Sequence, residues 1–162
     1  MNRIILIVFL ACLSLVSNAQ TSEKNDVTTF YLITHAESDS NTDTLSPKGI
    51  NRANNWVNVF SDTKLDVVYV TTDNCSKQTA HPTAKTQKAG VFSLEPTQQY
   101  DGGFKYNTDG KNILIVGNSK ELTRFGNLIG NSNLTINNDD FSNVYVITVT
   151  NAGTTQITLK VN

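Results

Sequence analysis

Three short runs of β-forming residues, each followed by a polar turn and a helix-forming segment, constrain the fold most strongly. Near-continuous apolar runs are typical of strands covered on both faces, and their alternation with helices implies a largely parallel sheet. Two later runs alternate apolar and polar residues about a turn at 151–154, which predicts an antiparallel hairpin. We therefore predict an α/β three-layer sandwich, with a mostly parallel sheet, helices on both faces and a C-terminal antiparallel hairpin. The runs are Val27–Thr34, Leu65–Val70 and Ile113–Val116, then Asn143–Thr150 and Gln156–Val161.

The helices are predicted from caps and spacing. Ser46 is placed as an N-cap with Pro47 at the first helical position. Helical spacing then gives an apolar face of Ile50, Ala53, Trp56 or Val57, and Phe60, with Asn51, Arg52, Asn54 and Asn58 facing water. A second helix is expected from about Ser76 to Lys88, with Pro82 inside it. A third opens at Asn118-Ser119, presents Leu122, Phe125 and Leu128 or Ile129, and closes at Gly130. Residues 91–94 suit a short edge strand, and residues 95–111 are expected to form a loop.

The N-terminal residues are predicted to lie outside the fold. Arg3 precedes an apolar run, and Ser17-Asn18-Ala19 offers small residues for cleavage, which together indicate a secretory signal peptide over residues 1–19. Residues 20–26 are expected to be a disordered lead-in, and 27–162 a single domain. The run is too short to span a bilayer. We expect export to the periplasm or the extracellular space after cleavage near Ala19; lipoprotein anchoring through Cys12 is the less favoured alternative.

Composition limits the partners. Removing residues 1–19 takes Arg3 from the 13 basic residues against 14 acidic ones, so the mature net charge is −2. A negative chain argues against nucleic acid or an anionic membrane as partner. Cys75 then has no second cysteine with which to form a disulfide. No later segment is apolar enough to be a transmembrane helix.

Polar turns follow the three strands of the predicted parallel sheet, at residues 34–36, 71–75 and 117–119. Carboxyl ends of parallel strands share one edge, where ligands bind, and the following helix N-termini favour anions. We expect a small anionic ligand at this edge.

Five segments, in order, resemble the histidine phosphatase (phosphoglycerate mutase-like) superfamily: YLITHAE, LSPKGINRANNW, VVYVTTDNCSKQTAHPTA, ILIVGNS and NDDFSNVYVITV. The resemblance covers 28–161 and implies a short member without helical cap insertions. It implies that His35 is the nucleophile that accepts phosphorus, beside two arginines and a second histidine. In this chain those three positions are Thr34, Cys75 and Asn118, so three of the four phosphate-pocket residues are replaced.

The size of the expected rate loss decides what these replacements mean for ordinary catalysis. Removing one preorganised donor to a transition state costs about 2.7–4 kcal/mol, or roughly 10²–10³ in rate. Thr34 and Asn118 retain neutral donors, and Cys75 a weak one. Lys77, Lys120 and Arg124 are the nearby cations, and Lys77 or Lys120 reaching into the pocket is the alternative to their being solvated.

Other chemistry-bearing residues have competing interpretations. Glu95 or Asp101 is a candidate proton donor, or a loop residue. Glu37 is expected to hydrogen-bond its loop, and His81 to lie on the surface. Cys75 at a helix start is either reactive through a lowered pKa or inert. A metal site from His35, Asp39 and His81 lacks recognisable ligand spacing, so we predict neither metal nor cofactor.

These residues lead to two hypotheses. The first is a secreted, catalytically impaired or inactive phosphohydrolase homologue that acts as a binding module for a small phosphorylated or other anionic ligand, or for an extracellular protein partner. The alternative is an active phosphomonoesterase in which His35 accepts phosphate with non-standard pocket residues.

Overall fold

The computed structural model describes residues 27–39 and 42–161, so the signal peptide, lead-in and Cys12 predictions lie outside the described residues. A six-stranded sheet has the order β3-β2-β4-β1-β5-β6. β1 (Thr28–Thr34), β2 (Val67–Val70), β3 (Gly90–Ser93) and β4 (Asn112–Gly117) run parallel, while β5 (Asn143–Thr150) and β6 (Gly153–Lys160) add an antiparallel hairpin. This confirms the predicted α/β class and the C-terminal hairpin.

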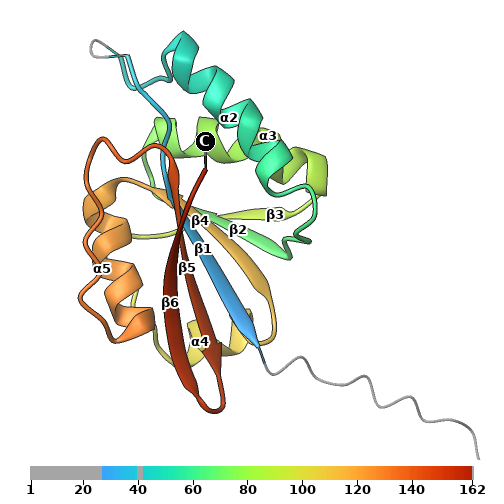
Figure 1. Ribbon diagram of the computed structural model, residues 1–162, viewed down its shortest axis with the longest axis vertical. Coiled ribbons are helices and arrows are strands. Elements are labelled where there is room, and N and C mark those ends of the chain that lie inside the picture. Colours follow the sequence, from blue (N-terminus) through green and yellow to red (C-terminus); the bar gives the residue numbers. More distant parts are fainter. Residues whose placement is uncertain (1–26, 40–41, 162) are drawn as a thin grey trace, which may run out of the picture.

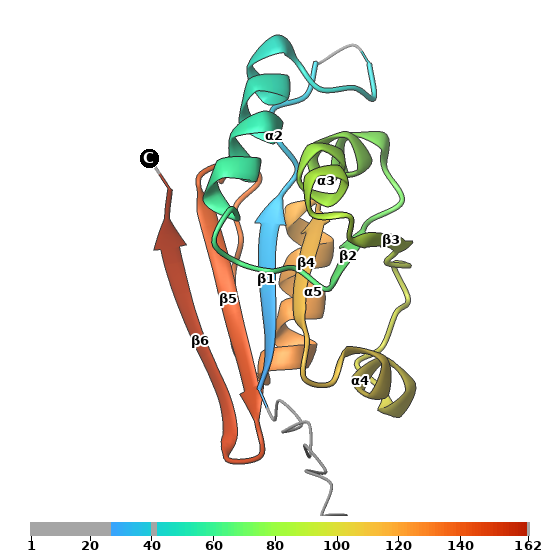
Figure 2. The ribbon, with the colours of Figure 1, turned by 90° about the vertical axis from the view of Figure 1, so that its right-hand side faces the viewer.

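Helices cover both faces of the sheet (Figures 1 and 2). α2 (Pro47–Val59) and α3 (Asn74–Gln87) lie on one face, and α4 (Gly102–Thr108) and α5 (Ser119–Gly130) on the other. β1 explains the two cores, because alternate residues point to opposite faces. Phe30 and Leu32 pack with Phe125 of α5, whereas Ile33 packs with Trp56 of α2.

The predicted start of α2 is confirmed. Ser46 is the N-cap, its hydroxyl accepts a hydrogen bond from Gly49 N, and Pro47 opens the helix. Two predictions about its faces are wrong. Ile50 is exposed at 51%, and Arg52 is half-buried because it turns back onto Glu37. Trp56, rather than Val57, is the buried member of its pair.

Residues 95–111 are not all loop. α4 forms within them because Asp101 caps it by accepting from Phe104 N, and Phe104 is buried against Phe30, Tyr69 and Phe125. α4 contains two glycines and mostly polar residues. Its buried aromatic side chain, Phe104, has no apolar partner at helical spacing within α4, so no periodic pattern marks the helix.

One helix start and the hairpin turn also differ from prediction. α3 starts at Asn74, since Asp73 is its N-cap. α5 ends at Gly130, as predicted, and its C-cap Asn131 takes the left-handed conformation. Ile129 is buried and Leu128 is exposed. The hairpin turn is only Asn151-Ala152, because Gly153, with φ of 142°, already pairs with Thr150.

Candidate functional site at the carboxyl edge of the sheet

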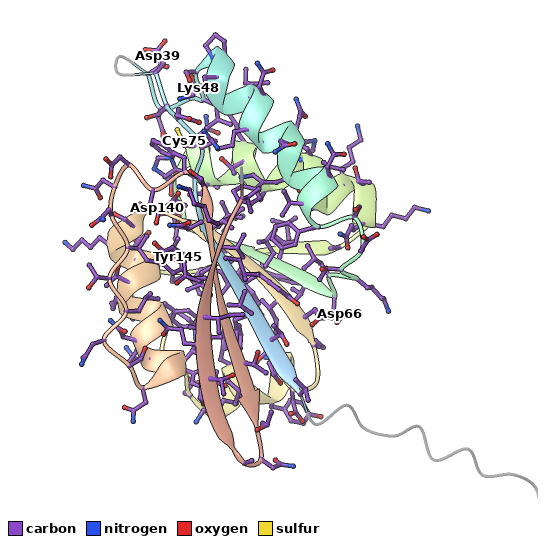
Figure 3. The ribbon with its side chains drawn as sticks, in the orientation of Figure 1. Asp39, Lys48, Asp66, Cys75, Asp140 and Tyr145 are labelled. Carbon is purple, nitrogen blue, oxygen red and sulfur yellow. The ribbon has the colours of Figure 1, made fainter. Side chains whose placement is uncertain are left out.

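The three polar turns meet at one edge of the sheet, as predicted. Val70 of β2 pairs with Val116 of β4, and Thr34 of β1 pairs with Gly117. The ladder continues past the strands, where His35 N donates to Gly117 O at 2.9 Å. Figure 3 shows Cys75 and Asp140 at this end of the sheet and Asp66 away from it.

His35 is half-buried at this edge. Its Nδ1 lies 2.9 Å from Ala36 O. A carbonyl oxygen only accepts, so Nδ1 is the donor in this hydrogen bond. This bond leaves Nε2 as the ring nitrogen that is not bonded to Ala36.

Residues of the quoted motifs hold the loop that carries His35. Ala36 N donates to Thr79 Oγ1 at 2.9 Å, and Leu45 N donates to Gln78 Oε1 at 2.8 Å. Ser46 N and Oγ both donate to Glu37 O. The motif residues of the α2 and α3 helices thus serve as supports for the loop, and none of these bonds needs a ligand.

Glu37 does more than hydrogen-bond its loop. Arg52 Nε and Nη2 donate to its carboxylate at 2.8 and 2.7 Å, and Lys48 Nζ lies 3.2 Å away. The bidentate bond from Arg52, with a smaller contribution from Lys48, outweighs burial and lowers the pKa of Glu37 to about 2. The Arg52 guanidinium is therefore committed to an internal ion pair.

Thr34, Cys75 and Asn118, the three positions to which the resemblance points, each make a hydrogen bond within the protein. The Thr34 hydroxyl donates to Asp140 O, and Cys75 Sγ lies 3.7 Å from Asp43 Oδ1. Asn118 caps α5, accepting from Glu121 N at 2.9 Å and donating to Glu121 Oε2 at 2.6 Å. The neutral donors expected at Thr34 and Asn118 are therefore occupied.

The start of α3 is already occupied by two carboxylates. Asp73 Oδ1 accepts from Ser76 N at 2.8 Å, and the hydroxyls of Thr71 and Ser76 donate to Oδ2. Burial opposes ionisation of Asp73, but these bonds and the nearby His35 lower its pKa overall. Asp43 accepts from Asn74 N at 3.3 Å. Negative groups at a helix N-terminus are favourable, so protein carboxylates take the place of an anionic ligand.

Cys75 is buried and is not activated. Burial, then the charges of Asp43 and Asp73, raises the pKa of its thiol to about 11. Of the two interpretations of Cys75, the raised pKa favours the inert thiol, because burial and two carboxylates outweigh the helix terminus.

The other predicted residues are dispersed. Glu95 is exposed and follows Leu94, whose N donates to Val70 O, so it lies at the same edge. Asp101 caps α4, which lies at the opposite end of β1 (Figure 2). His81 is exposed beside a groove between α2 and α3 of about 420 Å³.

The predicted cations lie on α3 and α5. Lys120 and Arg124 line a cleft of about 370 Å³ with Asn118, Glu121 and Pro96, and Arg124 Nη1 donates to Gln98 O at 3.0 Å. Lys77 is exposed on α3. Across residues 27–39 and 42–161, no hydrogen bond or ion pair joins a lysine or arginine to His35.

In the part of the chain that the structure describes, no three His, Cys, Asp or Glu residues are placed to hold a metal ion. Nor does it contain a helix with the length and apolar character needed to cross a membrane.

Sequence reasoning missed several residues of this edge, namely Asp43, Arg52, Asp140 and Tyr145. Tyr145 OH donates to Asp140 Oδ2, and burial followed by that carboxylate raises the pKa of Tyr145 to about 12. Asp140 thereby joins β5 to Thr34 at the end of β1. In the sequence, the one signal for this link is that Asp140 and Tyr145 both lie in the quoted segment NDDFSNVYVITV.

No protein-family model matches this sequence, and no curated protein matches it. Solved structures do. A phosphoglycerate mutase from Bacillus anthracis has a TM-score of 0.65 at 14% identity, covering 84% of this chain and 94% of its own. The alpha-ribazole phosphatase from Shigella flexneri has a TM-score of 0.60 at 17% identity, covering 82% and 96%.

A mutant phosphoserine phosphatase from Entamoeba histolytica, in complex with phosphoserine, has a TM-score of 0.60 at 12% identity and covers 80% and 94%. Likeness at such identities speaks for the fold. This chain has the fold of the histidine phosphatase, or phosphoglycerate mutase-like, proteins.

Proposed function

We propose that this protein is an exported binding module with a histidine phosphatase fold that has lost ordinary phosphomonoesterase activity. One observation carries the proposal. Thr34, Cys75 and Asn118, the positions implied to neutralise a phosphoryl group, are uncharged and bonded to their own chain. Asp43 and Asp73 add negative charge beside Cys75. A phosphate dianion needs charge-assisted donors, and the charged groups around Cys75 are carboxylates.

The energetic consequence is large. Each lost transition-state donor costs roughly 10²–10³ in rate, and losses at three positions, although not additive, remove several orders of magnitude. Binding of a phosphate in its ground state weakens for the same reason. The proposed ligand is therefore a small molecule held by other contacts, or an extracellular protein partner whose contact surface does not depend on His35.

The test compares the purified protein with His35→Ala over a panel of phosphomonoesters. His81→Ala is the matched control, because His81 is the other histidine and is exposed on α3. We expect no turnover above the His35→Ala background. Turnover that His35→Ala abolishes and His81→Ala preserves would overturn the proposal.

A second candidate is supported by the hydrogen bond of His35. Nδ1 is bonded to Ala36 O, so Nε2 is the nitrogen that would attack phosphorus when the imidazole is neutral. This candidate is an active phosphohydrolase with non-standard pocket residues. It predicts a trapped phosphohistidine and inhibition by vanadate, neither of which the binding module shows.

Restoring the side chains that the resemblance implies tests whether their replacement accounts for the proposed loss of phosphatase activity. The variant Thr34→Arg, Cys75→Arg, Asn118→His is expected to gain phosphatase activity that a further His35→Ala change removes. Circular dichroism first establishes that the triple variant is folded. A folded but inactive triple variant would show that replacing these side chains is not sufficient to account for the loss.

Export is tested separately. The test is to sequence the N-terminus of the protein recovered from outside the cytoplasm. We expect its first residue to be Gln20. A lipid-modified N-terminus at Cys12 would instead establish anchoring, and recovery of the intact chain in the cytoplasm would overturn export.

A further inference from the structure

We propose that two copies of this chain pair through strand β6, in antiparallel register about a two-fold axis at Thr158. β6 ends the sheet, and all of its residues, Gly153–Lys160, are exposed. Ile157 and Leu159 are exposed at 54% and 49%. The β5 residues opposite them, Val146 and Val144, are buried in the core on the α2 face. β6 itself lies at the outer edge of the sheet (Figure 2). This inference concerns assembly and does not depend on whether His35 is active.

The hydrogen-bonding capacity of the free edge follows from the register of the hairpin. Val161 N donates to Ser142 O, and alternate residues of an antiparallel strand face the same neighbour. Leu159 and Ile157 therefore direct their backbone groups toward β5. Gln156, Thr158 and Lys160 direct their N–H and C=O groups outward, where an added strand can bond them.

Features that normally protect an edge strand are sparse here. Proteins block free edges with charges, prolines, bulges or short strands. β6 has eight residues and no proline, and each of them pairs one-to-one with β5. Lys160 is the one charged side chain of residues 143–160. The opposite edge, β3, has only four residues.

The side chains select the register. Directly opposed residues of antiparallel strands point to the same face, so a two-fold axis normal to the sheet must pass at a residue. Centring it on Thr158 places Ile157 opposite Leu159 of the other copy, twice. Centring it on Ile157 leaves each Leu159 opposite Thr155. Only the first register buries both exposed apolar side chains against each other.

Charge is compatible with the same register. Lys160 of one copy lies opposite Gln156 of the other, whose amide oxygen can accept from the ammonium group. The two lysines are kept apart, so no like charges are opposed. A second copy of this chain therefore fits the edge without an uncompensated charge.

A matched pair of charge substitutions tests the axis. Thr158→Lys places two ammonium groups directly opposite each other, whereas Thr154→Lys makes the same change on the same face without opposing them. Both positions are exposed, so folding is unaffected. By analytical ultracentrifugation at micromolar to millimolar protein, we expect dimers for the wild type and Thr154→Lys and monomers for Thr158→Lys. A monomeric wild type, or equal behaviour of the two variants, would overturn the proposal.

Cross-linking gives an independent reading of the register. At the axis the two Cα atoms of residue 158 are expected about 5.5 Å apart, within the span of a disulfide. Residue 156 is displaced from its own copy by four residues, about 13 Å. Mild oxidation should therefore cross-link Thr158→Cys but not Gln156→Cys, with wild type as the control for Cys75. Cross-linking of Gln156→Cys in place of Thr158→Cys would exclude this interface.

Discussion

Glu37 illustrates how single residues at this edge serve the fold. Its carboxylate receives a bidentate bond from Arg52 and lies beside Lys48, so a half-buried cation near the His35 loop is neutralised internally. Arg52 also stacks over Phe141, with Cζ 5.9 Å from the ring centroid. The residue that the resemblance associates with a catalytic motif has become an anchor between β1 and α2.

Replacing Glu37 tests this anchor through pH. The Glu37 pKa falls from 4.5 to about 2 on folding, chiefly through Arg52, so its contribution to stability is present above pH 4.5 and is lost as pH falls toward 2. Glu37→Gln should lower the free energy of unfolding by about 2 kcal/mol at neutral pH. Urea denaturation at several pH values should show this difference vanishing in acid. Lys48→Gln, at a side chain exposed by 75%, should cost less than about 1 kcal/mol.

The pKa of Cys75 is shifted in the opposite direction from that of Glu37, and the shift can be tested through the reactivity of the thiol. A thiol pKa raised from 9.0 to about 11, first by burial and then by Asp43 and Asp73, lowers the thiolate fraction at neutral pH about 100-fold. Reaction with a disulfide reagent should therefore be slow in the folded protein and absent in Cys75→Ala. Asp43→Asn should accelerate it by removing one negative charge. A wild-type rate equal to that of a free thiol would contradict the assignment.

At the scale of elements, the entry into α2 depends on a close approach of two backbones. A side chain at Gly49 would overlap Glu37 O, the carbonyl to which Ser46 donates. Gly49→Ala must push the helix start away from the His35 loop and should destabilise the protein by more than about 2 kcal/mol in thermal or urea unfolding. Gly102→Ala is the control, because nothing lies within 4 Å of its added methyl group, and it should be neutral or slightly stabilising. Equal losses at the two glycines would refute this explanation.

At the scale of the whole molecule, one sheet with a core on each face should unfold as a unit. Phe125 is fully buried on the α5 side, while Trp56, the one tryptophan, reports from the α2 side. Phe125→Ala should lower the free energy of unfolding by about 3–5 kcal/mol, and Ile50→Ala, at an exposed position, by less than about 0.5 kcal/mol. Fluorescence and circular dichroism should give coincident transitions. A separate transition for Trp56 would show that the two layers unfold independently.

The strands, the cap of α2 and the common edge of the three turns could be predicted from sequence because their signals are local. Apolar periodicity and a Ser-Pro start act within a few residues. The Asn118–Glu121 bond was also open to prediction, since an N-cap followed three residues later by Glu is a recognised pattern. α4 could not be predicted from local signals, because its burial depends on a long-range contact between one aromatic residue, Phe104, and Phe30 of β1.

By itself, the sequence determined that the three positions which the resemblance assigns to a phosphate pocket, Thr34, Cys75 and Asn118, carry no basic side chain. Only the tertiary structure decided what those side chains do instead. Thr34 bonds to Asp140 O, 106 residues away, and Cys75 lies against Asp43, 32 residues before it. No local pattern specifies such partners, because they are chosen when distant strand ends are brought to one edge of the sheet. The same packing placed carboxylates at the start of α3, which turned an anion-favouring helix terminus into one that is already satisfied.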